Sequence, residues 1–149
     1  MEYVVTLDDK GRISLPSRVR GTIKGNCIIL TKGLINSIWA FLPEEWEKFN
    51  QEQLKNQSTL PLNKQMVYQH QFIAPKADIE LDKAGRIAIP PTLRDFACLS
   101  RDCKILELDN HLEIWDSEHY KAYEKVIESQ LQEVLEEMGP ASLFSGNPR

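Results

Sequence analysis

A ten-residue phrase occurs twice in this chain, as LDDKGRISLP at residues 7–16 and as LDKAGRIAIP at residues 81–90. Six of the ten positions are identical, and the second phrase follows the first at an offset of 74 residues. Chance rarely repeats a phrase that holds Gly, Arg and Pro in register, so we interpret the pair as an internal duplication. The fold must therefore accommodate two copies of one unit.

Each phrase predicts a β-hairpin with a tight turn, over residues 3–15 and again over residues 78–89. The flanking segments are rich in β-branched and aromatic residues, or alternate between apolar and polar residues, as strands do. Turn chemistry separates them in the first copy, because Gly11 tolerates positive φ and Asp8 accepts hydrogen bonds from nearby amides. The four predicted strands are 3–7, 12–15, 78–81 and 86–89.

The same order of elements follows each hairpin, so each unit reads ββαββα. A proline opens a short helix, two apolar strands come next, and a longer helix begins at acidic or capping residues. Each unit is too small to enclose a core alone, so we expect the two to interleave into one closed barrel with outer helices. The remaining predicted strands are 27–31, 38–42, 104–108 and 112–115, and the predicted helices are 16–20, 43–55, 64–72, 92–97 and 117–138.

The predicted domain organisation is one structural unit made of two sequence repeats. The first repeat spans residues 1–55, a polar connector spans 56–74, and the second repeat spans 75–138. Gly139 and Pro140 end the last helix, and the tail at 139–149 is expected to be mobile.

Charge is segregated along the chain, although the net charge is only −4. Residues 8–24 carry five bases against two acids, and residues 82–104 carry five bases against three acids. Both repeated phrases therefore open basic segments, which suit a polyanionic partner despite the acidic average. Residues 116–137 carry seven acids against two bases, and an apolar stripe on the same helix suits packing on the barrel or on a neighbouring subunit.

Several classes of protein are disfavoured by features that the sequence lacks. No apolar run approaches the about 18–20 residues that span a bilayer, and the start does not resemble a signal peptide. The cysteines form no Cys-x-x-Cys pair, which favours reduced thiols in the cytoplasm. No metal site, nucleophile arrangement or phosphate-cradling loop is recognisable, so we expect a non-enzyme without metal, cofactor, small-molecule substrate or membrane partner. The cysteines and histidines that could have formed such a metal site or nucleophile arrangement are Cys27, Cys98, Cys103, His70, His111 and His119.

The repeated phrases resemble the MraZ family, bacterial proteins made of two SpoVT/AbrB-like repeats that each carry an Asp-x-x-x-Arg motif. An apolar strand, a Pro, a short helix and a further Arg follow each motif, and the resemblance covers about residues 1–138. The motif residues are Asp8 and Arg12, followed by Arg20, in the first repeat, and Asp82 and Arg86, followed by Arg94, in the second.

The resemblance implies an α+β, mainly β fold, in which two ββαββα repeats form a pseudo-symmetric double-psi-like or AbrB-type barrel. It also implies a ring-shaped homo-oligomer and a transcriptional regulator, located in the cytoplasm with the nucleoid. Such a regulator binds double-stranded DNA at G-rich direct repeats in the promoter of the division and cell wall gene cluster.

Arg12 and Arg86 are the strongest candidates for DNA contact, because an Arg can donate two N–H groups to guanine O6 and N7. An Arg that only pairs with the Asp of its own turn is the alternative, and the two roles are compatible. We assign Asp8, Gly11, Asp82 and Gly85 to the structure of the turns and not to DNA contact.

Other basic residues are candidates for phosphate contacts, which position a protein without reading sequence. Lys10 corresponds to Ala84 in the second repeat, so we expect the first repeat to contribute more, with Lys83 partly compensating. The weaker candidates are Arg18, Arg20, Arg94 and Lys24.

Two other functions remain open at this point. The chain is alternatively a protein-binding adaptor that uses the barrel and the acidic C-terminal helix. It is alternatively another AbrB-like regulator or antitoxin, although those usually carry one repeat per chain and swap elements between subunits.

Overall fold

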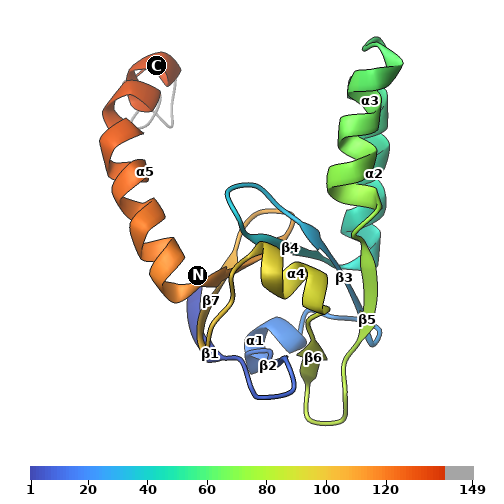
Figure 1. Ribbon diagram of the computed structural model, residues 1–149, viewed down its shortest axis with the longest axis vertical. Coiled ribbons are helices and arrows are strands. Elements are labelled where there is room, and N and C mark those ends of the chain that lie inside the picture. The colour runs from blue at the N-terminus through green and yellow to red at the C-terminus, as the bar shows by residue number, and fades with distance from the viewer. Residues whose placement is uncertain (140–149) are drawn as a thin grey trace, which may run out of the picture. The chain divides into compact units, whose positions relative to one another are not determined.

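The computed structural model describes residues 1–139, which fall into two compact units that divide after Ser117. Figure 1 labels the elements along the chain. The strands are β1 (Glu2–Thr6), β2 (Arg12–Ser14), β3 (Cys27–Lys32), β4 (Ile38–Phe41), β5 (Ala77–Glu80), β6 (Arg86–Ala88), β7 (Asp102–Glu107) and β8 (Leu112–Asp116). The helices are α1 (Ser17–Arg20), α2 (Pro43–Asn56), α3 (Leu62–Tyr68), the π-helical turn η1 (Gln69–Ile73), α4 (Pro91–Phe96) and α5 (Ser117–Met138).

The order of elements confirms the predicted class, an α+β, mainly β fold built from two ββαββα repeats. The connector also carries the predicted short helix, as α3 followed by η1. From residue 140 onward, the tail predicted to be mobile lies outside the described residues. No helix in the described part of the chain is both long and apolar enough to cross a membrane.

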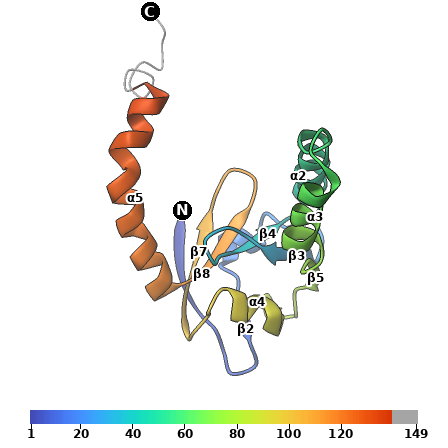
Figure 2. The same cartoon turned by 45° about the horizontal axis from the view of Figure 1, so that its top comes forward.

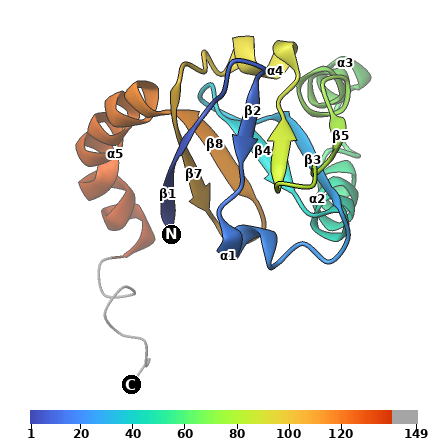
Figure 3. The same cartoon turned by 90° about the horizontal axis from the view of Figure 1, so that it is seen from below.

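The strands of the first unit form a six-stranded antiparallel sheet, ordered β1-β7-β8-β4-β3-β5, and a two-stranded antiparallel ribbon of β2 and β6. In the two repeats, β1 corresponds to β5, β3 to β7 and β4 to β8. Exchanging each strand for its counterpart gives the same strand order in reverse. The ribbon has the same symmetry, because Ile13 faces Ile87 at its centre. Figure 3 shows the ribbon lying across one face of the sheet.

The predicted hairpins are wrong, although the tight turns within them are present. β1 pairs with β7, β5 pairs with β3, and β2 pairs with β6, so strands on either side of one turn separate. Within the first phrase a single bridge, between Leu7 and Ile13, joins the two strands. The chain leaves the sheet after each turn because its amides find acceptors in the other repeat. Leu15 N donates to Gly85 O at 3.0 Å, and Ile89 N donates to Gly11 O at 2.9 Å.

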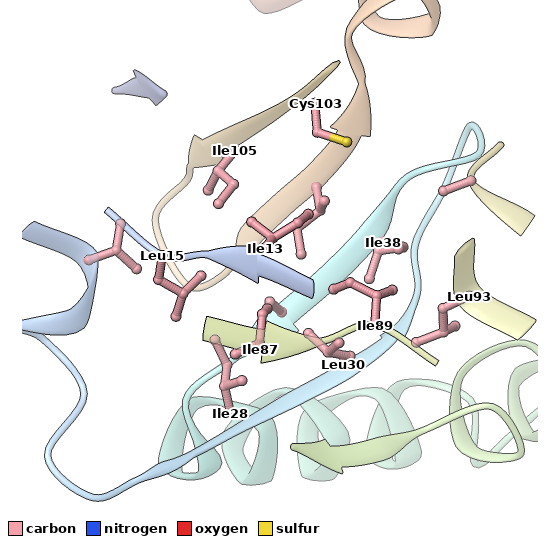
Figure 4. Close-up of a cluster of buried hydrophobic side chains, with 14 residues drawn as sticks. Ile13, Leu15, Ile28, Leu30, Ile38, Ile87, Ile89, Leu93, Cys103 and Ile105 are labelled. Carbon is pink, nitrogen blue, oxygen red and sulfur yellow. The ribbon is translucent and has the colours of Figure 1, made fainter. Parts of the chain in front are cut away.

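The main core lies between the ribbon and the sheet. Figure 4 shows Ile13 and Ile87 pointing from the ribbon towards the apolar side chains of the sheet. Both side chains are fully buried, as are the apolar side chains of β3, β4, β7 and β8 in the same cluster. The buried cluster is Ile13, Leu15, Val19, Ile28, Leu30, Ile38, Ala40, Ile87, Ile89, Leu93, Ala97, Cys103, Ile105 and Ile114.

A second, aromatic cluster attaches helix α2 and turn η1 to the opposite face of the sheet. Ile29 and Phe41 alternate with the main-core residues of β3 and β4, so their side chains point to this other face. They pack against Trp46 of α2 and Phe72 of η1. α2 and α3 lie side by side, as Figure 2 shows, and Tyr68 donates its hydroxyl to Asn50 Oδ1 at 2.7 Å.

The three cysteines are free thiols in different environments, which predicts selective modification. Burial raises the pKa of the Cys103 thiol to about 12, whereas Cys98 is exposed. Because the thiolate is the nucleophile, iodoacetamide at pH 8 should modify Cys98 in the native protein and spare Cys103 until denaturant is added. Peptide mass spectrometry measures this order, and equal native rates at the two thiols would contradict the buried position of Cys103.

Candidate nucleic-acid interface

The two motif turns have the same backbone and project to the same side of the first unit, at the bottom of Figure 1. In the first turn Asp8 N donates to Arg12 O at 2.9 Å and Gly11 N donates to Asp8 O at 3.0 Å. The second turn repeats both bonds, at 3.0 Å and 2.9 Å. Gly11 and Gly85 both have φ of +76°, a conformation that a residue with a Cβ adopts only with strain.

The aspartate of each turn binds both the turn backbone and the following arginine. Asp8 Oδ1 accepts hydrogen bonds from the amides of Lys10 (2.9 Å) and Arg12 (2.8 Å), and its Oδ2 accepts one from Arg12 Nε (2.9 Å). Asp82 repeats the pattern with Ala84 N (2.9 Å), Arg86 N (2.9 Å) and Arg86 Nε (2.7 Å). Each carboxylate therefore closes its turn and orients one guanidinium.

These bonds give a prediction about acid pH. The backbone amide of Arg12 lowers the pKa of Asp8, and that of Arg86 lowers the pKa of Asp82, with help from each guanidinium. Because folding lowers these pKa values, the ionised carboxylates stabilise the folded state at pH values above the ordinary pKa of 3.8. This contribution is lost as the pH falls through the lower folded value. NMR titration of the two carboxyl carbons should give midpoints below 3.8, and midpoints at or above 3.8 would contradict the described turns.

The pairing of each arginine with its own aspartate leaves the terminal guanidinium nitrogens available. Of the side-chain nitrogens of Arg12 and Arg86, only Nε bonds to the aspartate, and within residues 1–139 the Nη atoms make no hydrogen bond. The side chains are 27% and 34% exposed, so part of each arginine side chain reaches solvent. Pairing with the aspartate thus uses Nε, whereas a guanine contact uses the free Nη atoms, so the two roles of each arginine are compatible.

The register of the ribbon places both arginines on one surface. Arg12 faces Ala88 and Arg86 faces Ser14, so the two arginines are diagonal neighbours across the β2–β6 pair. Such neighbours lie about 7–8 Å apart on the same face. Ile13 and Ile87 point to the other face, into the core. One surface therefore presents two similar guanidinium groups, which we call the arginine pair.

The tips of the turns differ in charge. Lys10 is exposed in the first turn beside Asp9, whereas Lys83 is exposed in the second turn beside Ala84. Residues 8–12 thus carry two acids and two bases, and residues 82–86 carry one acid and two bases. This balance does not favour the first turn, so the prediction that the first repeat contributes more needs a direct comparison of the two.

Two of the weaker candidates lie on other parts of the first unit. Arg18 is exposed on α1. Lys24 is exposed in the loop before β3, in a hollow that it lines with Pro43 and Glu44.

Arg20 and Arg94 lie against the turn of the opposite repeat, an arrangement that the sequence reasoning missed. A Cβ placed on Gly11 would lie 2.8 Å from Cζ of Arg94, and one placed on Gly85 would overlap the guanidinium of Arg20. Arg94 Nε donates to Ile89 O at 2.9 Å, and Arg20 Nη1 donates to Ala84 O at 3.4 Å. The equal spacing from each motif to its following Arg indicates that Arg20 and Arg94 are equivalent. It does not indicate that each of them contacts the turn of the other repeat.

Among residues 1–139, no three side chains of His, Cys, Asp or Glu come together in a group that could hold a metal ion. The chemistry that the described turns offer is thus hydrogen-bond donation from exposed guanidinium groups.

Comparison with known proteins finds similarity over nearly the whole chain. The family model described as "MraZ protein, putative antitoxin-like" matches residues 1–66 and 72–139, one segment per repeat. A protein of Treponema denticola named "Transcriptional regulator MraZ" is 39% identical over 138 residues, covering 93% of this chain and 95% of its own. Proteins of the same name from Treponema pallidum (38% identity, covering 81% of this chain and 80% of their own) and Natranaerobius thermophilus (34%, covering 92% and 94%) are also similar.

Proposed function

Because this chain belongs to the MraZ family, we propose that it is a sequence-specific DNA-binding transcriptional regulator. Its target is the set of G-rich direct repeats in the promoter of the division and cell wall gene cluster, and it works in the cytoplasm at the nucleoid. The single observation that carries the proposal is the arginine pair, two oriented guanidinium groups with free Nη atoms on one surface. The relatives are named as regulators, which supports a role other than enzyme.

The mechanism of recognition starts from the turns. Asp8 and Asp82 each hold the Nε of one arginine, so the side chain has few rotamers to lose when its free Nη edge binds. That edge donates to O6 and N7 of a guanine in the major groove. The carboxylates repel phosphate little, because each is compensated by a guanidinium and two backbone amides. Lys10 and Lys83, at the turn tips, contact phosphates and position the turns.

A homo-oligomeric ring raises the affinity that one pair of arginines supplies. Several copies that engage several direct repeats bind through effective concentration, which multiplies weak individual contacts. Self-association is supported by exposed apolar side chains on α2, on α3, in the loop between them and in the β3–β4 loop, because exposed apolar groups mark sites of protein association. These residues are 42% to 72% exposed: Leu34, Ile35, Leu54, Leu60, Leu62, Met66 and Val67.

Salt-dependent binding to matched DNA tests the proposal. Fluorescence anisotropy is measured on a duplex with G-rich direct repeats and on one whose guanines are exchanged for adenines. We expect a preference of roughly a hundredfold or more for the first, since each mismatched pair costs about 1–3 kcal/mol. Affinity for both duplexes should fall steeply with salt, because bound protein releases counterions. An absence of binding to either duplex at low salt would contradict the proposal.

A second candidate function, a protein-binding adaptor, is favoured by the acidity of α5. Its last two turns contain Glu133, Glu136 and Glu137 without a base. Changing these three residues to Gln should leave DNA binding unchanged if the protein is a regulator that reads DNA with its turns. If it is an adaptor, the change should instead abolish capture of a basic partner, measured by co-purification. The description of the family as antitoxin-like keeps a related antitoxin role within the same DNA-binding class.

A further inference from the structure

Each turn of the arginine pair is covered by an arginine that the other repeat supplies. Arg94, from α4 in the second repeat, lies on Gly11 of the first turn. Arg20, from α1 in the first repeat, lies on Gly85 of the second turn. Both glycines are buried, although the turn residues directly before them are exposed. The covering guanidinium groups therefore occupy the space beside each glycine that a side chain would need.

Backbone hydrogen bonds run in the same crossed direction. Leu15 N, just before α1, donates to Gly85 O, and Ile89 N, just before α4, donates to Gly11 O. Each short helix thus starts two residues after a bond that ties it to the opposite turn. The arginine in the last turn of each helix then lies over that same turn. Each turn is therefore contacted by a backbone amide and by an arginine side chain of the opposite repeat.

The contacts of Arg94 are those of a structural residue. Its side chain is half-buried, and its Nε is occupied by Ile89 O at 2.9 Å. Arg20 is exposed, and its bond to Ala84 O is longer, at 3.4 Å. Arg94 thus packs on Gly11 of the first turn while its Nε is bonded to Ile89 of its own repeat, whereas Arg20 bonds directly to the backbone of the second turn.

We propose that Arg20 and Arg94 are positioning residues, each of which holds the DNA-contacting turn of the opposite repeat. Their effect on DNA rests on the proposed function, whereas their effect on the turns does not. The glycine in each turn leaves room for the guanidinium, and the guanidinium restricts the glycine, a residue type with unusually wide backbone freedom. A restricted turn presents Arg12 or Arg86 in one orientation before DNA arrives. The orientation of each DNA-contacting turn therefore depends on a side chain of the other repeat.

The first arm of the test measures the turns without DNA. Amide hydrogen exchange, followed by NMR, compares the wild type with Arg94→Ala, Arg94→Lys and Arg20→Ala. We expect Arg94→Ala and Arg94→Lys to speed exchange about tenfold or more at residues 8–12 while residues 82–86 keep their rates. Arg20→Ala should do the reverse, with faster exchange at residues 82–86 and unchanged rates at residues 8–12. Unchanged exchange in the opposite turn, or a change confined to the variant's own repeat, would overturn the proposal.

The second arm measures binding to the G-rich duplex across salt concentrations. A positioning role predicts about tenfold weaker binding for Arg94→Ala, no rescue by Arg94→Lys, and an unchanged dependence of log K on log salt. A phosphate contact predicts the opposite, rescue by Lys and a slope that falls by roughly 0.9 for the Ala variant. In double variants, Arg94→Ala should lose its effect when combined with Arg12→Ala and keep it when combined with Arg86→Ala.

The two arms separate failure of the inference from failure of the proposed function. Wild-type protein that binds no DNA would contradict the function, and the exchange arm would still decide whether the arginines hold the opposite turns. Circular dichroism and thermal unfolding of each variant establish that the fold is retained. If Arg94→Ala unfolds, Arg94→Lys, which keeps the aliphatic stem and the charge, carries the comparison.

Discussion

Replacing Arg12 and Arg86 together with Ala is expected to abolish the preference for G-rich DNA while the fold persists. Each bidentate contact between an arginine and a guanine contributes about 1–3 kcal/mol of discrimination, so two contacts amount to roughly 30-fold to 10⁴-fold. The fold should persist because both side chains lie on the outer face of the ribbon, opposite Ile13 and Ile87. Anisotropy measures the binding loss, and circular dichroism with size-exclusion chromatography measures the fold and assembly.

A matched control removes the same charge elsewhere. Arg101 and Lys48 are exposed and lie outside both turns, so the variant Arg101→Ala/Lys48→Ala should keep the preference for guanine. Its affinity should fall only modestly and equally on both duplexes, as expected for a general electrostatic effect. The single variants Arg12→Ala and Arg86→Ala then show which turn contributes more. Specificity that survives the double change of the arginine pair would show that the DNA-contacting residues lie elsewhere.

Truncating Ile13 or Ile87 to Ala should give the largest loss of stability. The two side chains are fully buried and face each other at the centre of the ribbon. Removing one leaves a cavity beside the sheet and should lower the free energy of unfolding by about 2–5 kcal/mol, against about 0.5–1.5 kcal/mol for Ile→Val. The double variant should be non-additive, since the two residues share one site.

Denaturant unfolding measures these losses, with Val4→Ala as the control. Val4 is 79% exposed on β1, so its truncation should change stability by no more than about 0.5 kcal/mol. If a buried Ala variant proves too unstable to fold, the Val variants still rank buried against exposed positions. Losses under about 0.5 kcal/mol for Ile87→Val and under about 1 kcal/mol for Ile87→Ala would contradict the position of the ribbon over the core.

Element positions were largely predictable from the sequence, and strand partners were not. The helices at 43–55 and 117–138 were predicted within one residue of α2 and α5, because proline, acidic residues and apolar spacing all mark them locally. The hairpin over 3–15 was predicted wrongly, because alternation identifies a strand without identifying its neighbour. β1 and β2 part to join β7 and β6, more than 70 residues away, and this choice depends on burial of the whole core.

The candidate site divides along the same line. The Asp8–Arg12 and Asp82–Arg86 pairs could be anticipated, since turn chemistry and a spacing of four residues are local features. The covering of Gly11 by Arg94 and of Gly85 by Arg20 could not, because it follows from the exchange of strands between repeats. The charge at the turn tips could be read from the sequence, and the expectation that the first repeat contributes more to DNA binding stays a prediction.

Footprinting on the DNA upstream of the protein's own gene tests the central claim most directly. The wild type should protect the G-rich direct repeats at low salt, and protection should weaken as the salt concentration rises. The Arg12→Ala/Arg86→Ala variant should protect none of them, whereas Arg101→Ala/Lys48→Ala should protect all of them. No protection by the wild type, or equal protection by the wild type and the Arg12→Ala/Arg86→Ala variant, would contradict recognition by the arginine pair.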